Sequence, residues 1–356
     1  MRPLNIALDI TDRCNLKCVM CHFSNYERLT FPPYDPADAG NMPVELFEKI
    51  AAEYFPHSWR VALGCGAEPL MHPKFTEIVA IAGKHGVPDL WFPTNLLPLT
   101  ERSAEAIVKA GVTTVAVSVD GITKETYEKI RIGGRWDKLM EKLELLRRVR
   151  REHRSRRPHL RIIFTWMQSN RHELRDVPAF AEAQGAREID IRYVAPTAGV
   201  DTSAELLSTI DRAELNAELA AVAKDAVRRG LRLSSFPEYE TPADRPRSLL
   251  GRVRRRAFRI RAGLERMEYW RHYWREQKTG CGYPDHNYVI RANGSVFPCI
   301  FWEDDPIGSA RQLSYAEIAA GKALSCIRDG LAKGEPVGTC THCTARRDAF
   351  YRPKHA

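Results

Sequence analysis

Three cysteines follow a short apolar segment near the start of the chain: Cys14, Cys18 and Cys21. Three thiolates on one loop suit a 4Fe-4S cluster and leave one of its irons without a protein ligand. The structural alternatives are a zinc site that lacks one ligand and a group of unrelated core cysteines. Because an iron without a protein ligand can bind a second molecule, the spacing predicts a cluster that takes part in chemistry.

A second group of cysteines lies near the C-terminus and consists of two pairs. Residues 288–291 and 295–298 are predicted to form a hairpin between the first two cysteines, and Asn293-Gly294 favours a type I′ turn there. Four thiolates complete either a 4Fe-4S cluster or a tetrahedral zinc site. The predicted fold must therefore bring together Cys281, Cys299, Cys340 and Cys343.

The segment from residue 4 to about 236 alternates between short β-branched runs and helical patterns, which is typical of repeated βα units. Six units predict an α/β fold with an open, partial (β/α)6 barrel and a site at the carboxyl ends of its strands. The predicted strands are 5–9, 59–63, 89–93, 113–119, 160–166 and 188–194. The predicted helices are 44–54, 73–85, 102–110, 136–151, 171–184 and 213–229.

The pattern divides the chain into a barrel over 1–240, a helical insertion over 241–278 and a small α+β domain over 279–356, with a helix over 315–331. The net charge of +9 is local, since residues 241–275 alone hold eleven arginines and three acidic residues. The insertion could meet a phosphate-bearing or carboxylate substrate, an acidic carrier protein or a membrane surface, or it could be a solvated face. Nucleic acid is not expected, because no nucleic-acid-binding module is recognisable.

No export signal and no apolar run long enough to span a membrane is found in the sequence. The chain is therefore expected in the cytoplasm. Its nine cysteines are then expected to be reduced thiols and metal ligands rather than disulfides.

The Cys-x3-Cys-x2-Cys motif after the first strand resembles the radical S-adenosylmethionine (SAM) superfamily. The resemblance implies a 4Fe-4S cluster whose free iron chelates the methionine moiety of SAM and cleaves it to a 5′-deoxyadenosyl radical. Met20 stands before the third cysteine, where the family usually has an aromatic side chain near the adenine. We expect it to supply a similar apolar contact.

Further positions resemble the family's cofactor-holding residues. Residues 64–70, Gly-Cys-Gly-Ala-Glu-Pro-Leu, look like its Gly-Gly-Glu-Pro motif, with a plain βα turn as the alternative. Polar residues at the ends of the next two strands match positions that contact the cofactor's ribose and carboxylate, with turn capping as the alternative. The residues that the resemblance assigns to the cofactor in these segments are Gly66, Glu68, Asn95, Ser118 and Asp120.

On the sixth strand, Asp190 and Arg192 alternate with apolar residues, so the two are expected to face the barrel interior. Such a pair suits a cofactor or substrate anchor, and an internal salt bridge without a catalytic part is the alternative.

The four C-terminal cysteines resemble those of the twitch domain, a shorter relative of the SPASM domain that carries one auxiliary 4Fe-4S cluster. Among twitch proteins their spacing is similar to that of the dehydrogenase that oxidises an aminocyclitol in butirosin biosynthesis. The resemblance implies hydrogen abstraction from a small sugar, aminocyclitol or nucleoside-like substrate, followed by electron transfer to the auxiliary cluster. It also implies antibiotic or other specialised biosynthesis and a reductase or flavodoxin-type electron donor.

Other readings stay open. A redox-neutral epimerase would need a thiol hydrogen donor, and Cys326 and Cys65 are the cysteines outside the two groups. A peptide-modifying maturase of the RiPP or sulfatase type is a further alternative; because the triad begins at residue 14, without a preceding leader-binding segment, the sequence favours a small molecule. A non-catalytic zinc or iron–sulfur protein would not need Glu68, Asn95 or Ser118 beside an open cluster.

Overall fold

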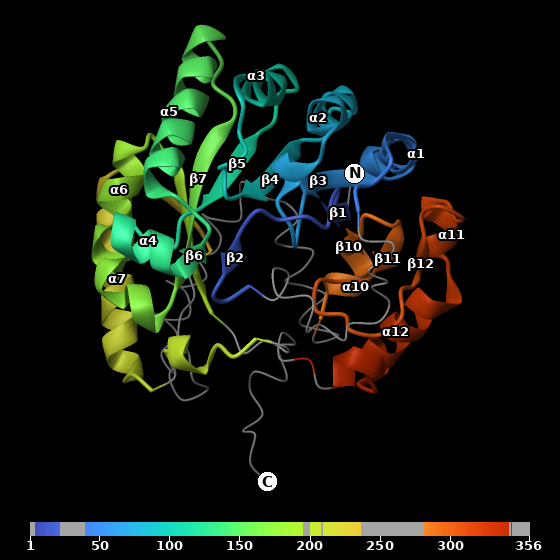
Figure 1. The fold of residues 1–356 in the computed structure, drawn as a ribbon. Coiled ribbons are helices and arrows are strands. Elements are labelled where there is room, and N and C mark those ends of the chain that lie inside the picture. The colour runs from blue at the N-terminus through green and yellow to red at the C-terminus, as the bar shows by residue number, and fades with distance from the viewer. Residues whose placement is uncertain are drawn as a thin grey trace.

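The computed structural model describes residues 4–21, 40–194, 200–207, 209–235, 281–341 and 343. The predicted arginine-rich insertion over 241–278 lies outside these residues. The described part has the predicted α/β architecture: a curved sheet follows the inside of the molecule and a row of helices follows its outer side (Figure 1).

One ten-stranded sheet contains all six predicted strands, in the order β12-β11-β10-β1-β3-β4-β5-β7-β8-β9. The six confirmed strands are β1 (Leu4–Leu8), β3 (Ser58–Leu63), β4 (Asp89–Thr94), β5 (Thr114–Ser118), β7 (His159–Trp166) and β8 (Glu188–Tyr193). They pair in parallel, as repeated βα units require. Two further strands extend the parallel sheet: β9 (Arg232–Ser235), which was not predicted, beside β8, and β10 (Asn287–Ile290), the predicted first strand of the hairpin, beside β1.

The C-terminal segment is therefore joined to the barrel sheet. After β10 the chain turns into β11 (Ser295–Phe297) and β12 (Gly308–Ser309), which pair antiparallel. The predicted type I′ turn is wrong, because Gly294 adopts a positive φ of 91° and Asn293 does not. Gly294 N donates to Arg291 O at 2.8 Å, which closes a three-residue loop with glycine at the left-handed position.

The helices largely follow the predicted pattern. Five lie within two residues of the predicted bounds at each end: α1 (Val44–Tyr54), α2 (Phe75–Lys84), α3 (Glu101–Lys109), α5 (Trp136–Glu152) and α7 (Arg212–Arg228). The helix predicted over 171–184 is instead a 3-10 segment, η5 (Gln168–Asp176), followed by α6 (Val177–Ala183), with Pro178 in the first turn of α6.

Two further helical segments differ from the prediction. The helix predicted over 315–331 is divided into α11 (Tyr315–Ala319) and α12 (Lys322–Lys333), because Gly321 serves as the N-cap of the second helix. The short helix α4 (Lys124–Ile130) was not predicted; it begins where the Thr123 side chain accepts a hydrogen bond from Thr126 N.

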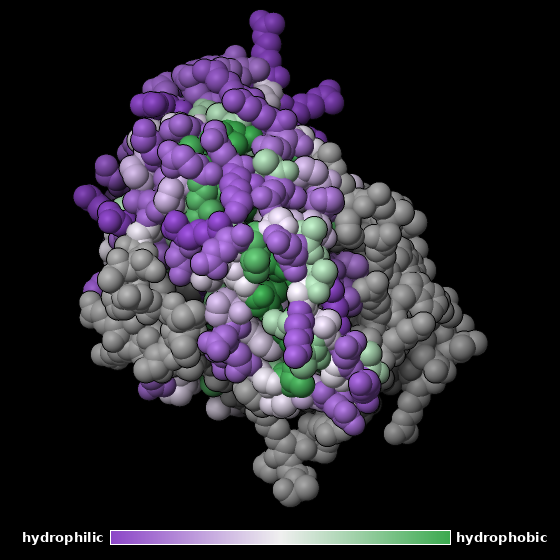
Figure 2. All heavy atoms as spheres, turned by 90° about the vertical axis from the view of Figure 1, so that its right-hand side faces the viewer, coloured by the Kyte–Doolittle hydropathy of each residue, from purple (hydrophilic) through white to green (hydrophobic). Residues whose placement is uncertain are grey.

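The core lies between the sheet and the outer helices. Ile189 and Ile191 of β8 are fully buried in it, as are Ile162 and Phe164 of β7. Residues that alternate with them point to the opposite, concave face. On the face seen in Figure 2, the described residues are mostly hydrophilic, with small apolar patches among them.

Candidate functional site

The cysteine loop follows β1 directly and returns through β2 (Lys17–Cys18). Cys14 is exposed, Cys18 is buried and Cys21 is half-buried. Burial raises the pKa of the Cys18 thiol to about 11, and the neighbouring Cys14 and Cys21 thiols add to this rise. The three thiols are thus close enough to act on one another, which fits a shared cluster.

The strand β2 is held by β6 (Arg131–Ile132), which pairs with it antiparallel and sets Arg131 opposite Cys18. Arg131 Nη1 donates to Cys18 Sγ at 3.8 Å, and Arg131 Nη2 forms an ion pair of 2.5 Å with Asp120 Oδ2. Sequence reasoning missed Arg131, because it belongs to none of the motifs used.

Asp120 is fully buried and engaged by the protein. It adopts a left-handed φ of 56°, and its Oδ1 accepts from Thr165 N at 2.7 Å. Its backbone O accepts from Asn170 Nδ2 at 2.8 Å. Both carboxylate oxygens thus have protein partners, which gives Asp120 a structural role. Its contact with the cofactor stays a prediction. Ser118, two residues earlier, is half-buried and makes no hydrogen bond with its side chain among the described residues.

The glycine-containing loop after β3 is fastened to the first strand. Asp9 Oδ1 accepts from Cys65 N at 2.5 Å and from Gly66 N at 3.0 Å. Glu68 N donates to Arg13 O at 3.0 Å, which joins the loop to the residue before Cys14. The loop over residues 64–70 therefore lies beside the three-cysteine loop.

The carboxylate of Glu68 accepts three hydrogen bonds in a buried position. Oε1 accepts from Thr94 Oγ1 at 2.6 Å and from Leu70 N at 3.1 Å, and Oε2 accepts from Asn95 N at 2.6 Å. Burial nevertheless raises the pKa of Glu68 to about 7, because desolvation outweighs these hydrogen bonds. Its side chain ties the ends of β3 and β4 together.

Asn95 connects this network to the cysteine loop. Its Nδ2 donates to Asn15 Oδ1 at 2.9 Å, and its Oδ1 accepts from Leu97 N at 3.0 Å. Asn15 lies between two cysteines of the triad. Met20, on the same loop, is half-buried.

The concave face also carries two ion pairs. Asp190 Oδ2 accepts from Arg192 Nη2 at 2.6 Å, and Asp9 Oδ2 accepts from Arg291 Nη1 at 2.6 Å. Burial raises the pKa of Cys65 to about 12, while both arginines act in the opposite direction. Cys65 therefore lies within electrostatic reach of Arg192 from β8 and of Arg291, which follows β10.

One carboxylate oxygen of Asp190 has no hydrogen-bond partner among the described residues. The residue is 4% exposed, and this oxygen, Oδ1, is buried. A buried acceptor of this kind costs free energy unless it is paired. It could therefore accept a hydrogen bond from a bound molecule.

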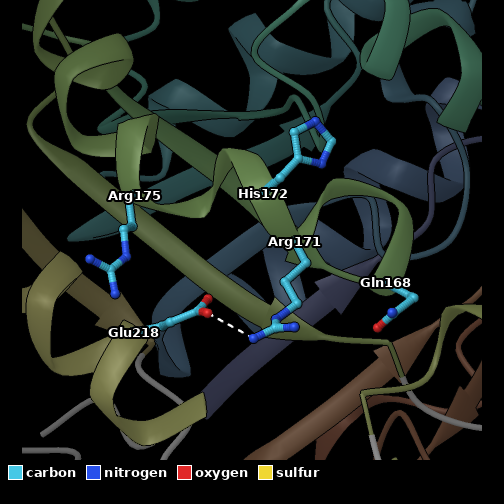
Figure 3. Close-up of a pocket in the computed structure, with 5 residues that line it drawn as sticks. All are labelled: Gln168, Arg171, His172, Arg175 and Glu218. Carbon is cyan, nitrogen blue, oxygen red and sulfur yellow. Dashed lines mark hydrogen bonds and ion pairs between the residues drawn. The ribbon is translucent and has the colours of Figure 1, made fainter. Parts of the chain in front are cut away.

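A pocket separate from these groups lies between η5 and α7 (Figure 3). Arg171 is already paired there with Glu214 and, at 2.9 Å, with Glu218. None of the predicted site residues lines this pocket, whose lining is Gln168, Arg171, His172, Arg175 and Glu218.

The four C-terminal cysteines converge. Burial raises the pKa of Cys299 to about 12, and the thiols of the other three members of the group add to the rise. Among the residues that the structure describes, no three His, Cys, Asp or Glu side chains are arranged to hold a single metal ion. A 4Fe-4S cluster binds each thiolate at a different iron, so mutually close thiols fit it.

Cys326 stands apart from both groups. It is exposed on α12, whose buried residues include Leu324, Ile327 and Leu331. Cys326, a predicted hydrogen donor, therefore lies outside the packed face of the helix. Cys65, the other predicted donor, lies in the barrel.

A curved parallel sheet with one three-cysteine loop and one four-cysteine group is the arrangement of an iron–sulfur enzyme. Residues 8–160 match the Radical SAM superfamily, and residues 281–344 match SPASM, an iron-sulfur cluster-binding domain. The chain belongs to the radical SAM superfamily and carries a SPASM-type domain, and these two domains imply SAM and 4Fe-4S clusters as its cofactors.

Among curated proteins, the GTP 3',8-cyclase of Listeria welshimeri is 31% identical over 140 residues, which are 39% of this chain and 40% of that protein. The matched segment is thus less than half of the relative's length.

Two solved structures share the fold. SuiB of Streptococcus suis bound to S-adenosylmethionine has a TM-score of 0.68 at 14% identity, over 99% of this chain and 76% of that chain. The structure of anSMEcpe with bound AdoMet has a TM-score of 0.59 at 15% identity, over 91% and 79% of the two chains. Within the described residues, no helix is both long and apolar enough to cross a membrane.

Proposed function

We propose that this chain is a radical SAM oxidoreductase that removes hydrogen from a small polar substrate, such as a sugar, an aminocyclitol or a nucleoside, in specialised metabolism. When bound, the cluster and SAM supply a 5′-deoxyadenosyl radical, and the auxiliary cluster supplies an electron acceptor for dehydrogenation. The proposed setting is the cytoplasm, with a reductase or flavodoxin-type protein as electron donor.

One observation carries this proposal: the cluster domain contributes to the barrel site. Arg291 follows β10 of that domain and pairs with Asp9 at 2.6 Å. The same Asp9 carboxylate accepts from the amides of Cys65 and Gly66. An arginine of the iron–sulfur domain is therefore one side chain away from the loop proposed to hold the cofactor.

The proposed ligands of the radical SAM cluster are Cys14, Cys18 and Cys21. Their loop is held in place by the Asn15–Asn95 hydrogen bond and by the contact between Glu68 N and Arg13 O. Gly66, Ser118 and Met20 are proposed cofactor contacts, while Glu68, Asn95 and Asp120 would shape the site through the bonds described above. The proposed ligands of the auxiliary cluster are Cys281, Cys299, Cys340 and Cys343.

The concave face suggests the substrate class. Arg192 is 47% exposed in its side chain although it pairs with Asp190, so its remaining donors can reach a bound molecule. The unpartnered Asp190 Oδ1 can accept from a hydroxyl or amine. Charged donors and acceptors on one face of the sheet favour a polar substrate, including one with a carboxylate or phosphate. The name of the curated relative, GTP 3',8-cyclase, agrees with a nucleotide-like candidate.

A redox-neutral reaction is the second candidate. Cys65 lies in the barrel, and burial keeps its thiol protonated, as a hydrogen-atom donor requires. A peptide substrate is the third, because one solved structure of the same fold is SuiB bound to precursor peptide SuiA.

The test is hydrogen transfer into 5′-deoxyadenosine. Reduced, anaerobically reconstituted protein is incubated with SAM and deuterated candidates: GTP and other nucleotides, aminocyclitols, hexoses and a peptide control. We expect deuterium in 5′-deoxyadenosine with a small polar candidate and a product lighter by two hydrogens. Uptake of one solvent deuterium at unchanged oxidation level, lost in Cys65→Ala, would support the epimerase instead. Transfer from the peptide alone would overturn the small-molecule proposal.

A further inference from the structure

A buried arginine lies against one of the proposed cluster cysteines. Arg131 is 7% exposed, and β2–β6 pairing places it directly opposite Cys18. Residues opposed in an antiparallel pair have side chains on the same face of the ladder. The hydrogen bond from Arg131 Nη1 to Cys18 Sγ at 3.8 Å is therefore fixed by the backbone as well as by the side chain.

We propose that Arg131 is a positioning residue that sets the reduction potential of the cluster on Cys14, Cys18 and Cys21 by donating to the Cys18 sulfur. The inference rests on the proposed cluster ligands and adds a residue that governs the ease of reduction. Hydrogen bonds to cluster sulfurs and net charge near the cluster are two of the factors that set such potentials.

The guanidinium is held from its far side. Its Nη2 pairs with Asp120 Oδ2 at 2.5 Å. Asp120 cannot move freely, since Thr165 N binds its Oδ1 and Asn170 Nδ2 binds its backbone O. Arginine suits this place because its planar fork can reach a sulfur and a carboxylate at once, whereas the point charge of lysine cannot match both geometries.

The sign of the effect follows from charge. Reduction of the cluster by one electron adds one negative charge, which the nearby guanidinium stabilises. Asp120 opposes this, but its carboxylate contacts the guanidinium at the nitrogen that does not bind Cys18. Arg131 donates directly to the Cys18 sulfur, so the positive charge of the pair acts at this atom. The low dielectric of a buried site strengthens both interactions.

Removal of the positive charge of Arg131 and removal of the negative charge of Asp120 should therefore shift the reduction potential in opposite directions. Arg131→Gln keeps a polar side chain without the charge and should make reduction at least tenfold less favourable, a shift of about 59 mV to more negative potential for one electron. Asp120→Asn should shift the potential positively. Asparagine is among the residues that tolerate the left-handed conformation that position 120 requires.

The experiment is an anaerobic redox titration of the full chain, monitored by EPR. The signal of the radical SAM cluster is identified as the one that changes when SAM is added. Iron and sulfide per chain are measured on every variant. Arg135→Gln is the matched control, since Arg135 is exposed and only four residues away. We expect its potential to equal that of the wild type, with the two test variants shifted in opposite directions.

Two results would overturn the inference while leaving the proposed function intact: unshifted potentials in variants that retain their iron, or shifts of the same sign in Arg131→Gln and Asp120→Asn. If Arg131→Gln fails to hold the cluster, Asp120→Asn decides by itself, and an absent positive shift refutes the proposal. Failure of the proposed cluster ligands looks different, because Cys18→Ala would then retain the full iron and sulfide content of the wild type, and failure of the proposed reaction would leave the redox titration unchanged.

Discussion

The buried carboxyl of Glu68 gives a sharp expectation for the dependence of stability on pH. Its pKa is raised to about 7 from 4.5, mainly by desolvation. A raised carboxyl pKa means that the folded protein keeps a proton that the unfolded chain releases. The contribution to stability is therefore complete below about pH 4.5 and is lost as the pH rises through about 7.

The magnitude follows from the shift. A change from 4.5 to about 7 is worth about 3.4 kcal/mol at 1.36 kcal/mol per pKa unit. Because the unfolded carboxyl is already mostly ionised at pH 5, about 2.5 kcal/mol of this is lost between pH 5 and pH 8. Glu68→Gln cannot ionise, so the variant lacks this part of the pH dependence.

The assay is urea unfolding of the metal-free, reduced protein at pH 5 and pH 8, followed by tryptophan fluorescence. The quantity of interest is the free energy of unfolding of the wild type minus that of Glu68→Gln. We expect this difference to fall by about 2.5 kcal/mol from pH 5 to pH 8, at similar denaturant slopes.

Glu48→Gln on α1 is the matched control, because Glu48 is exposed. Its difference from the wild type should change little with pH. If Glu68→Gln and the wild type lose stability in parallel over this range, the carboxyl is ionised in the folded protein and the reasoning from desolvation is refuted.

Three further expectations concern stability and use the same unfolding assay. Gly121→Ala should destabilise by about 1–3 kcal/mol, because a Cβ there would lie 2.5 Å from Tyr127 N; an unchanged midpoint would contradict this contact. Leu143→Ala should cost about 2–5 kcal/mol, since Leu143 is 1% exposed, and a loss below about 1 kcal/mol would place it outside the core. Asp211→Ala should cost about 0.5–2 kcal/mol, because Asp211 Oδ1 accepts from Ala213 N at 2.8 Å; Asp211→Asn should recover most of the loss.

The parallel strands could be predicted because each is a short apolar run between turn residues. The place of β10 could not: its pairing with β1 joins residues 5 and 287, and such a contact leaves no local pattern. The hairpin turn was misjudged for a related reason. Asn293 Oδ1 accepts from Ser295 N at 2.9 Å, so this side chain stabilises the loop without a left-handed backbone.

At the site, the sequence identified the groups but not their partners. Glu68 and Asp120 were chosen for their match to cofactor positions, and the structure shows how each holds neighbouring strands together. Arg131 could not be found from the motifs, because it matters through a strand pair only two residues long. An arginine eleven residues after a fully buried aspartate was the available signal, but burial is itself a property of the fold.

The central claim is that the seven cysteines of the two groups hold two 4Fe-4S clusters. The most direct test is iron, sulfide and zinc per chain after strictly anaerobic reconstitution, for the wild type and for the Cys340→Ala, Cys343→Ala double variant. About eight irons that fall to about four in the variant is the expected result. About four irons with one zinc in the wild type would make the C-terminal group a structural zinc site, contradict the account and remove the proposed electron acceptor.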